Sequence, residues 1–450
     1  MFSKEVYQHR RNALKQAIGS GIIILPGNEE SGMNYKDNLY PFRQDSCFLY
    51  FTGIDKPDLC LIIDIDNNQE IIFGDDATVE EIVWTGPQQP LALAAEASGI
   101  EFIRTKAEIE SAVKGNREVH YLPPYRAETT LKLMNWGIGG TASVPLIKAV
   151  IAQRSIKSAD EVAQIQIAVN TTVLMQKKAM EIARAGLTEN EIAGQLQAVA
   201  IAGGGNLAFP IILTVNGQFL HNHASMNVLK DGQMVLCDCG AENAMHYAGD
   251  LTRTFPVGNK FTAAQQDIYQ IVLNAHQTAA KALQPGVLFK DVHLLACEQL
   301  ATGLTELGLM KGDPKEAVAA GAHALFFQCG LGHMMGLDVH DMENLGEEYV
   351  GYTDELKKST QFGLRSLRLG KKLEPGFVLT VEPGLYFVPD LIDSWSSKNH
   401  LAQFINYEKV AGYKDFGGIR IEEDFLITTE GSRLLGAPLE KSITEIEALF

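Results

Sequence analysis

The chain has 450 residues, of which 46% are hydrophobic and 21% are charged. That balance is typical of a globular protein and excludes collagen-like repeats and wholesale disorder. The length predicts two or three domains at roughly 100–200 residues each. The net charge of −17 argues against nucleic acid or an anionic membrane surface as a partner, because both need a basic patch. Acidic side chains could instead bind metal ions.

The number and spacing of the cysteines and the length of the apolar runs indicate the cellular compartment. Six cysteines are sparse for this length and none stands in a CxxC pair, so neither a disulfide framework nor a thiolate zinc site is expected. The early apolar run 22–26 is too short for a secretory signal. No stretch approaches the roughly 20 apolar residues of a membrane span. We therefore expect a cytoplasmic protein without a membrane partner.

The first third of the chain alternates between helical and strand-like patterns, which is typical of an α/β layered domain. Nothing in this part suggests catalytic chemistry. We predict helices over 6–17 and 90–98, and strands over 21–26, 59–65, 71–73, 82–84 and 119–122.

A domain boundary is predicted near Arg154. Ser158 and Glu161 form an S-x-x-E capping box at the start of a long helical pattern, and Thr188 and Glu191 form a similar box for the next helix. Beyond a run of three glycines the chain turns into strands joined by Gly- and Asp-rich turns. Further helices are predicted over 263–283 and 292–307.

Acids and one histidine recur in strand-like segments of the second half. A carboxylate inside an apolar strand must be paired or bound to a cation, because burying it alone is very costly. Four carboxylates and one imidazole would balance two divalent ions, and oxygen-rich ligation favours Mn, with Co, Zn or Fe as alternatives. Two such ions would activate a shared water and polarise a carbonyl or phosphoryl group. The residues concerned predict a dinuclear metallohydrolase: Asp238, Asp250, His333, Glu382 and Glu422.

These segments resemble the metal-binding motifs of the creatinase/aminopeptidase family with the pita-bread fold, especially aminopeptidase P and proline dipeptidase (prolidase). Segments 40–46 and 50–53 resemble the N-terminal domain of those enzymes. The resemblance implies an α/β domain, similar to the creatinase/prolidase N-terminal domain, over 1–155, followed by an α+β pita-bread catalytic domain over 156–450. It also implies a homodimer or homotetramer.

The resemblance implies a role for each matched residue. Asp250 and Glu422 would bridge the two metal ions, Asp238 would chelate one, and His333 and Glu382 would bind the other. A hydroxide bridging the ions would attack the substrate, and Glu382 would accept its proton.

Further residues are implied around the substrate. His221 would contact it, although His223 could take its place. His340 would hydrogen-bond the scissile peptide, the alternative being a packed core histidine, and Arg420 would brace the site. His246, near the second aspartate, is more simply a solvated loop residue than a sixth ligand.

The chain departs from the family pattern in two places. Asp250 follows Asp238 by twelve residues, one more than is usual, which a loop or bulge can absorb. Cys329 occupies the position, four residues before His333, where the proline-specific enzymes carry a histidine in the substrate pocket. A thiol is shorter, a weaker donor and uncharged at neutral pH unless perturbed, so rate and substrate range are affected. A nucleophilic role for Cys329 is not expected.

Two features separate the possible activities. Arg368 matches the prolidase arginine that binds the free carboxylate of a dipeptide through a bidentate fork; the alternative is a solvated basic loop with Lys371 and Lys372. The long connection 387–416 is also prolidase-like, whereas the N-terminal segments are at least as close to aminopeptidase P.

The sequence therefore predicts a manganese-type Xaa-Pro dipeptidase acting on peptides with proline at the second position. Proline has no N–H and a fixed φ, so general peptidases handle it poorly. An Xaa-Pro aminopeptidase acting on longer peptides is the alternative. A metal-free scaffold on the same fold is a third possibility, disfavoured because no ligand position is lost.

Overall fold

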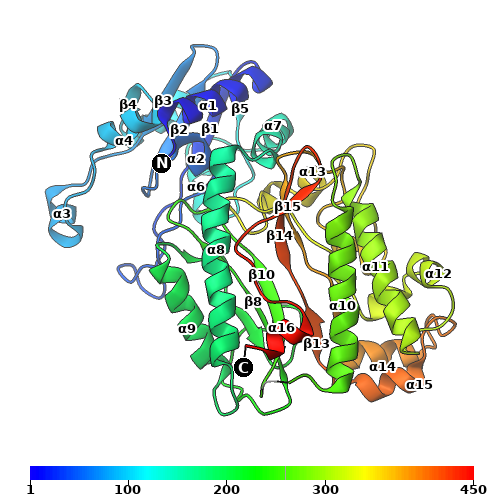
Figure 1. Ribbon diagram of the computed structural model, residues 1–450. Coiled ribbons are helices and arrows are strands. Elements are labelled where there is room, and N and C mark those ends of the chain that lie inside the picture. Colours follow the sequence, from blue (N-terminus) through cyan, green and yellow to red (C-terminus); the bar gives the residue numbers. More distant parts are fainter. Residues whose placement is uncertain (259, 450) are drawn as a thin grey trace. The chain divides into compact units, whose positions relative to one another are not determined.

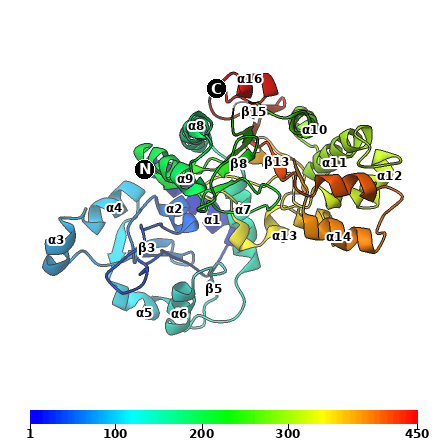
Figure 2. The same ribbon diagram turned by 90° about the horizontal axis from the view of Figure 1, so that it is seen from below.

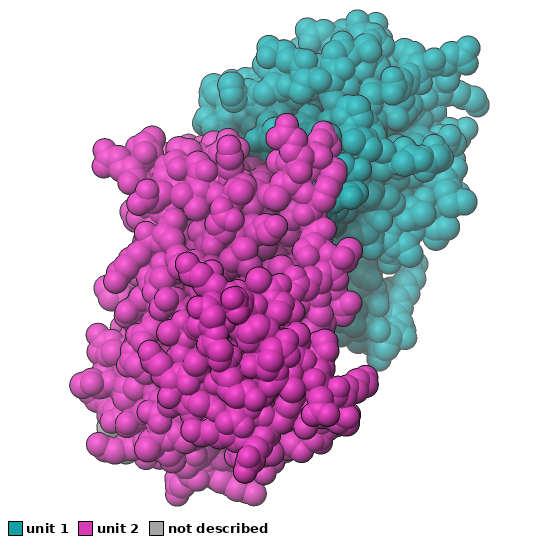
Figure 3. Space-filling model, turned by 90° about the vertical axis from the view of Figure 1, so that its right-hand side faces the viewer, with its two compact units in different colours: residues 1–154, 343–349 teal, residues 155–342, 350–450 magenta. Residues whose placement is uncertain are grey.

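The structure is a computed structural model, and it describes residues 1–258 and 260–449. The chain divides into two compact units, which Figure 3 colours separately. Unit 1 contains residues 1–154 with 343–349, and unit 2 contains 155–342 with 350–450. All six cysteines are free. None of the helices in the described ranges is long and apolar enough to cross a bilayer.

Unit 1 is built on a five-stranded sheet in the order β4-β3-β2-β1-β5. The central strands β1, β2 and β3 pair antiparallel with one another, and the outer strands β4 and β5 join them in parallel. Its strands are β1 (Ile22–Pro26), β2 (Cys60–Asp64), β3 (Gln69–Phe73), β4 (Phe102–Arg104) and β5 (Val119–His120). Its helices are α1 (Lys4–Ile18), α2 (Ser46–Thr52), α3 (Val79–Thr85), α4 (Leu91–Ser98), α5 (Ile109–Val113), α6 (Ala127–Asn135) and α7 (Val144–Ser155), with the short 3-10 turns η1 (Lys106–Glu108) and η3 (Glu343–Leu345).

Both faces of the central strands β1 and β2 are buried, whereas the edge strand β4 is exposed. Ile22 and Ile24 of β1 point into a core with α5 and α6, and the intervening Ile23 is buried on the opposite face. Covering both faces explains why the strands read as continuous apolar runs rather than as alternating ones.

One predicted strand in unit 1 is wrong. Residues 82–84 lie in helix α3, which no buried residue anchors. The Thr78 hydroxyl accepts a hydrogen bond from the Glu81 N–H, and the Glu81 carboxylate accepts one from the Thr78 N–H. This capping box satisfies the first free N–H groups of the helix and outweighs the strand propensity of Ile82 and Val83.

A buried arginine joins the layers of unit 1. Arg11 of α1 donates to the Glu70 carboxylate at 2.7 Å, and its Nη atoms donate to the carbonyls of Phe51, Ser98 and Gly99 at 2.8, 3.0 and 3.2 Å. These acceptors lie on or next to β3, α2 and α4. One guanidinium thus fixes α1 to three other elements.

We expect Arg11→Ala to lower the free energy of unfolding by about 3–5 kcal/mol, because it removes a buried guanidinium and leaves three backbone carbonyls without their donor. Urea denaturation followed by circular dichroism measures this. Lys15→Ala is the matched control: it removes the other cation bound to Glu70, at 3.0 Å from a half-buried position, and should cost no more than about 1 kcal/mol. Equal losses in the two variants would contradict the assigned role of Arg11.

Unit 2 places strands between two long helix pairs, α8–α9 and α10–α11, as both ribbon views show (Figures 1 and 2). Its helices are α8 (Ala159–Ile182), α9 (Glu189–Ala202), α10 (Ala263–Ala282), α11 (Phe289–Glu306), α12 (Pro314–Ala319), α14 (Pro389–Ser397), α15 (Tyr407–Val410) and α16 (Ile443–Glu447), and α13 (Glu347–Val350) spans the boundary between the units. The 3-10 turns are η2 (Ala322–Leu325), η4 (Leu364–Ser366) and η5 (Ala411–Tyr413).

The strands of unit 2 form small antiparallel sheets ordered β10-β8-β7, β11-β14-β15, β12-β13 and β6-β9. An isolated bridge between Thr252 and Glu422 links the first sheet to the connection between β13 and β14. The strands are β6 (Asn206–Leu207), β7 (Ile212–Thr214), β8 (Met234–Cys239), β9 (Ala241–Glu242), β10 (Leu251–Pro256), β11 (Val378–Val381), β12 (Gly384–Tyr386), β13 (Gly418–Arg420), β14 (Glu423–Ile427) and β15 (Ser432–Leu434).

The two helix starts predicted from capping boxes in unit 2 are confirmed, whereas the helix predicted over 292–307 begins earlier, at Phe289. Ser158 accepts from the Glu161 N–H at 3.3 Å and Thr188 accepts from the Glu191 N–H at 3.2 Å, so both capping boxes are present. Farther along α8, the buried Gln176 amide donates to backbone carbonyls at Cys237 of β8 and Leu251 of β10, at 3.1 and 2.6 Å. This helix therefore holds the strand pair that carries the first two acids of the predicted site.

Candidate metal centre and substrate site

The first two predicted ligands come from the β8–β10 pair. Asp238 lies in β8, opposite Thr252 of β10. Asp250 immediately precedes β10 rather than lying inside the strand as predicted, and both acids are buried. The Asp250 N–H donates to the Asp424 carboxylate at 3.0 Å, which fixes the backbone where the strand begins.

The other three predicted ligands arrive on separate segments. The Glu382 N–H donates to the Leu331 carbonyl at 2.7 Å, so the segment leading to His333 lies along the end of β11. Gly332 permits this approach, since a Cβ there would lie 2.0 Å from the Thr380 carbonyl oxygen. Glu422 lies between β13 and β14, and its N–H donates to the Thr252 carbonyl at 3.1 Å.

Four of these side chains converge directly. Asp250, His333 and Glu422 each offer a ligand atom within 4.8 Å of the others. His333 Nε2 lies 3.5 Å from Asp250 Oδ2 and 3.7 Å from Glu382 Oε1. The other ring nitrogen, Nδ1, is 3.1 Å from the Met334 carbonyl oxygen, which can only accept. The proton of the neutral ring therefore sits on Nδ1, and Nε2 presents its lone pair to the carboxylates.

Asp238 joins the cluster through Arg420. Arg420 Nη2 donates to Asp238 Oδ2 at 2.6 Å, and Nε donates to the Thr252 hydroxyl oxygen at 3.2 Å. That hydroxyl in turn donates to Glu422 Oε2 at 2.6 Å. The guanidinium thus connects acids that belong to different sheets.

The cluster holds more negative charge than the single Arg420 guanidinium can balance. Burial is the largest cause that raises the pKa of Asp250 and Glu422 well above their usual values, and neighbouring acids raise both further. Burial likewise raises the pKa of Glu382 to about 7. Asp238 Oδ1 and Asp250 Oδ1 are buried and have no hydrogen-bond partner within the described part of the chain. Unsatisfied carboxylate oxygens beside an imidazole fit divalent cations, which would supply the missing charge.

Supporting residues that the sequence reading did not identify include Thr252, Tyr386 and Asp424. Thr252 follows Asp250 by two, the spacing that places two residues on one face of a strand, and this could have revealed it. The Tyr386 hydroxyl accepts from Arg420 Nη1 at 2.9 Å. Asp424 is fully buried and holds the Asp250 N–H. Neither of the latter two has a local pattern that points to the site.

The predicted substrate residues surround the same cluster. The His340 ring lies edge-on to His333 with ring centroids 4.2 Å apart. The pKa of the exposed His221 is lowered, mainly by partial desolvation and then by the positive charge of Arg420. His223 is instead directed at the backbone, with Nδ1 3.4 Å from the Ile211 carbonyl oxygen. His221 is therefore the better placed of the two.

Cys329 and Arg368 lie together at the site. A Cβ on Gly330 would come within 3.0 Å of the Leu367 Cα, so the backbones of the two segments are in close contact. Burial raises the pKa of the Cys329 thiol to about 12, with Glu382 raising it further and Arg420 and Arg368 opposing. The group is a neutral thiol at physiological pH, which does not support a nucleophilic role.

The extra residue between the two aspartates is accommodated in the turn after β8. β9 and the left-handed residue His246, at φ 64°, occupy this turn. His246 is not solvated as expected: its side chain is 12% exposed, and Nδ1 lies 3.0 Å from Glu242 Oε1. It pairs with that glutamate.

Comparison with known proteins agrees with this geometry. The model of metallopeptidase family M24 matches residues 163–429, and that of the aminopeptidase P N-terminal domain matches residues 7–120. The Xaa-Pro aminopeptidase of Escherichia coli (strain K12) is 32% identical over 100% of this chain and 98% of its own length. The Xaa-Pro dipeptidase of Homo sapiens is 29% identical over 98% of this chain and 90% of its own.

Solved structures agree. Escherichia coli aminopeptidase P with the inhibitor Pro-Leu superposes with a TM-score of 0.82 at 30% identity, covering 100% of this chain and 98% of that one. The chain therefore belongs to metallopeptidase family M24. The expected fold, an aminopeptidase P-type N-terminal domain followed by an M24 catalytic domain, is confirmed.

The raised pKa of Glu382 predicts a pH dependence of stability. Between about pH 4.5 and pH 7, Glu382 of the folded, metal-free protein holds a proton. The same glutamate in the unfolded chain has a pKa of 4.5 and has released that proton. This difference in proton binding contributes to the free energy of unfolding. The contribution is complete below about pH 4.5 and is lost as the pH rises through about 7. As the pH rises from about 4.5 to about 7, the free energy of unfolding of Glu382→Gln should therefore increase by up to about 3 kcal/mol relative to that of wild type.

Urea titrations in the presence of a chelator measure this difference. Glu374→Gln, which changes an exposed glutamate at the turn before β11, is the control and should differ from wild type by the same amount at every pH. Parallel pH profiles for wild type and Glu382→Gln would show that the pKa of this glutamate is not raised.

Proposed function

We propose that this chain is a manganese-dependent Xaa-Pro dipeptidase that hydrolyses the bond before a carboxy-terminal proline. The observation that carries the proposal is that Arg368 lies beside the carboxylate cluster. Its positive charge acts on Glu382, Cys329 and His221 alike. It is half-buried, which disfavours the alternative of a fully solvated basic loop. A guanidinium near the cluster suits the free carboxylate of a two-residue peptide.

The connection 387–416 supports the segment that carries Arg368. It folds into α14, α15 and η5, and Phe387 packs against Tyr413 and Phe416 with ring centroids 5.3 and 5.1 Å apart. Trp395 of α14 reaches Phe362, at 6.2 Å between ring centroids, just before the turn η4. The Trp395 contact packs the start of the 362–368 segment against α14, and a more ordered segment loses less entropy when its arginine binds a carboxylate.

Two divalent ions would be held by Asp238, Asp250, His333, Glu382 and Glu422. Four carboxylates with a single imidazole form an oxygen-rich donor set, which favours Mn²⁺. When bound, the ions would lower the pKa of a water and polarise the scissile carbonyl. Glu382 would take up the proton of the attacking water and pass it to the leaving proline nitrogen.

The remaining residues would position the substrate. His340, packed against His333, can donate to the scissile peptide, and His221 approaches from the exposed rim. Cys329 and Tyr386, whose Sγ and hydroxyl oxygen are 4.0 Å apart, offer only neutral and weak donors. Arg420, held by Asp238 and Tyr386, stabilises the acids without contacting the peptide.

Metal content tests the ligand set. Asp250→Asn keeps the shape of the side chain but removes a charge and a ligand oxygen. Mutating a residue that only hydrogen-bonds a metal ligand typically lowers metal affinity by about 10–100-fold. We therefore expect the loss of this ligand to lower the affinity for Mn²⁺ by at least about 100-fold. Equilibrium dialysis with elemental analysis measures this. Asp267→Asn, on the outer face of α10, should keep wild-type content. A wild-type chain that binds no divalent ion would favour the scaffold interpretation.

Xaa-Pro aminopeptidase activity is the second candidate. It is favoured by the whole-chain likeness to Escherichia coli aminopeptidase P. The two activities differ in the group on the carboxyl side of the proline: a free carboxylate in a dipeptide, or a further peptide in a longer substrate. Arg368 beside the cluster favours the former.

We expect Mn²⁺-loaded wild type to hydrolyse Ala-Pro much faster than Ala-Pro-Ala. Arg368→Ala should lower kcat/KM for Ala-Pro by roughly 10- to 150-fold, because a charge-assisted hydrogen bond contributes about 1.5–3 kcal/mol. The rate for the tripeptide Ala-Pro-Ala should stay nearly unchanged. Arg365→Ala is the matched control, because Arg365 lies three residues away and stacks on Phe362. A wild-type preference for Ala-Pro-Ala would show an aminopeptidase instead.

A further inference from the structure

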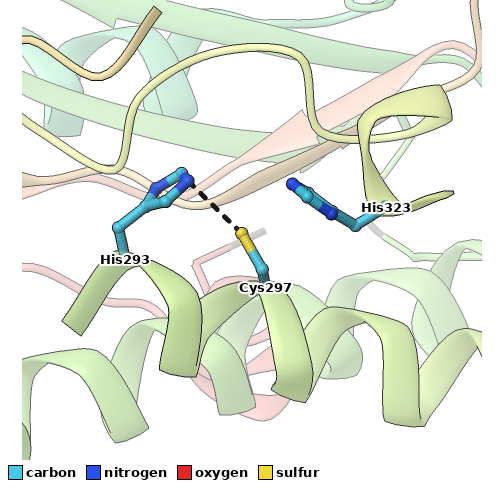
Figure 4. A group of neighbouring side chains, drawn as sticks. All are labelled: His293, Cys297 and His323. Carbon is cyan, nitrogen blue, oxygen red and sulfur yellow. Dashed lines mark hydrogen bonds between the residues drawn. The ribbon is translucent and has the colours of Figure 1, made fainter. Parts of the chain in front are cut away.

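A second cluster of metal-ligating side chains lies in unit 2 and shares none of its residues with the carboxylate centre. His293 and Cys297 are separated by one turn of α11, and His323 lies on the 3-10 turn η2. Ligand atoms of all three lie within 4.8 Å of one another, and all three residues are at least 98% buried. Figure 4 shows one ring nitrogen of His323 pointing toward Cys297 and His293.

The cluster leaves polar atoms unsatisfied. Cys297 Sγ and His293 Nε2 are 3.5 Å apart, the one hydrogen bond drawn in Figure 4. His293 Nδ1 and both nitrogens of His323 make no hydrogen bond within the described residues. The backbone of Val318 lies near enough to His323 to raise its pKa slightly against the larger effect of burial. Buried polar groups are nearly always satisfied, so a packed histidine pair explains these atoms poorly.

We propose that His293, Cys297 and His323 form a buried three-coordinate site for a thiophilic metal ion, Cu⁺. An ion about 2.3 Å from sulfur and about 2.0 Å from nitrogen in a trigonal arrangement holds those donors roughly 3.7 Å apart. Cys297 Sγ and His293 Nε2 are 3.5 Å apart, so a small side-chain shift would admit the ion. Binding would replace the thiol proton of Cys297 with the metal and release that proton to solvent.

The charge of the site favours Cu⁺ over Zn²⁺. Burial lowers the pKa of His293 to about 3 and of His323 to about 4, so both rings are neutral and offer lone pairs. One thiolate with two neutral imidazoles cancels a single positive charge, whereas Zn²⁺ would leave a net charge in an apolar interior. Structural zinc sites are also four-coordinate, and the cluster has three candidate ligands among the described residues.

The surroundings make the site a closed one. The Phe327 ring packs against His293 with centroids 5.6 Å apart, and a Cβ on Gly363 would lie 3.5 Å from His323 Nε2. The bound ion would tie α11 to η2, which leads into the segment carrying Cys329 and His333. Because the ligands are buried, the ion should exchange slowly and be retained through purification.

The test uses the full chain with Mn²⁺ present. We incubate it without oxygen with Cu⁺ supplied as its acetonitrile complex, challenge it with a Cu⁺ chelator, and measure copper and manganese per chain. Wild type should retain about one Cu⁺ with unchanged manganese, show a thiolate-to-copper absorption band, and melt at a higher temperature. Cys297→Ala should lose at least tenfold in Cu⁺ affinity and show no band, while Ala-Pro hydrolysis with Mn²⁺ alone stays at the wild-type rate.

Cys60→Ala is the matched control, because Cys60 is equally buried but lies in β2 of unit 1. It should retain Cu⁺ as wild type does. His323→Gln provides the same test should Cys297→Ala fail to fold. Equal Cu⁺ retention in wild type, Cys297→Ala and His323→Gln would overturn the site. One Zn²⁺ per chain, lost in these variants and preferred over Cu⁺, would overturn the choice of copper.

Discussion

Mutual repulsion among buried carboxylates is the constraint on which the catalytic unit depends. Asp238, Asp250, Glu382 and Glu422 face one another away from water, and burial raises the pKa of the last three. Arg420 supplies one compensating charge, through its 2.6 Å bond to Asp238. One guanidinium cannot balance four ionised carboxylates, so the raised pKa values favour protons on some of them while no cation is bound.

The architecture of unit 2 serves to bring these acids together against that repulsion. They arrive from separate small sheets, held in register by backbone bridges and by the buried amide of Gln176 beside β8 and β10. Thr252 touches both Arg420 and Glu422, and Gly332 lets the histidine segment lie on β11. Rigid strands suit this task better than loops would, because a metal centre tolerates little displacement of its ligands.

Cys329 and Arg368 add a neutral thiol and a positive charge near the carboxylate cluster. Burial raises the pKa of the thiol, and the charge of Arg368 opposes that rise. The two lie on segments in backbone contact, so a change in one affects the other. The cluster of His293, Cys297 and His323 lies in the same unit. It places nitrogen and sulfur donors apart from the oxygen donors of the carboxylate cluster.

The sequence by itself determined the helices that begin after Ser158 and Thr188, the central strands of unit 1 and the identity of the clustered acids, because these depend on local hydrogen bonds, periodicity and motif spacing. It misread 82–84, where a capping box outweighed strand propensity, and His246, whose partner Glu242 is seen only when the turn is formed. The tertiary structure alone decided that the backbone beside Arg368 lies against the backbone beside Cys329, that Asp424 holds Asp250, and that His323 meets His293 and Cys297. Such contacts join segments far apart in the chain, and packing rather than local pattern determines which of them meet.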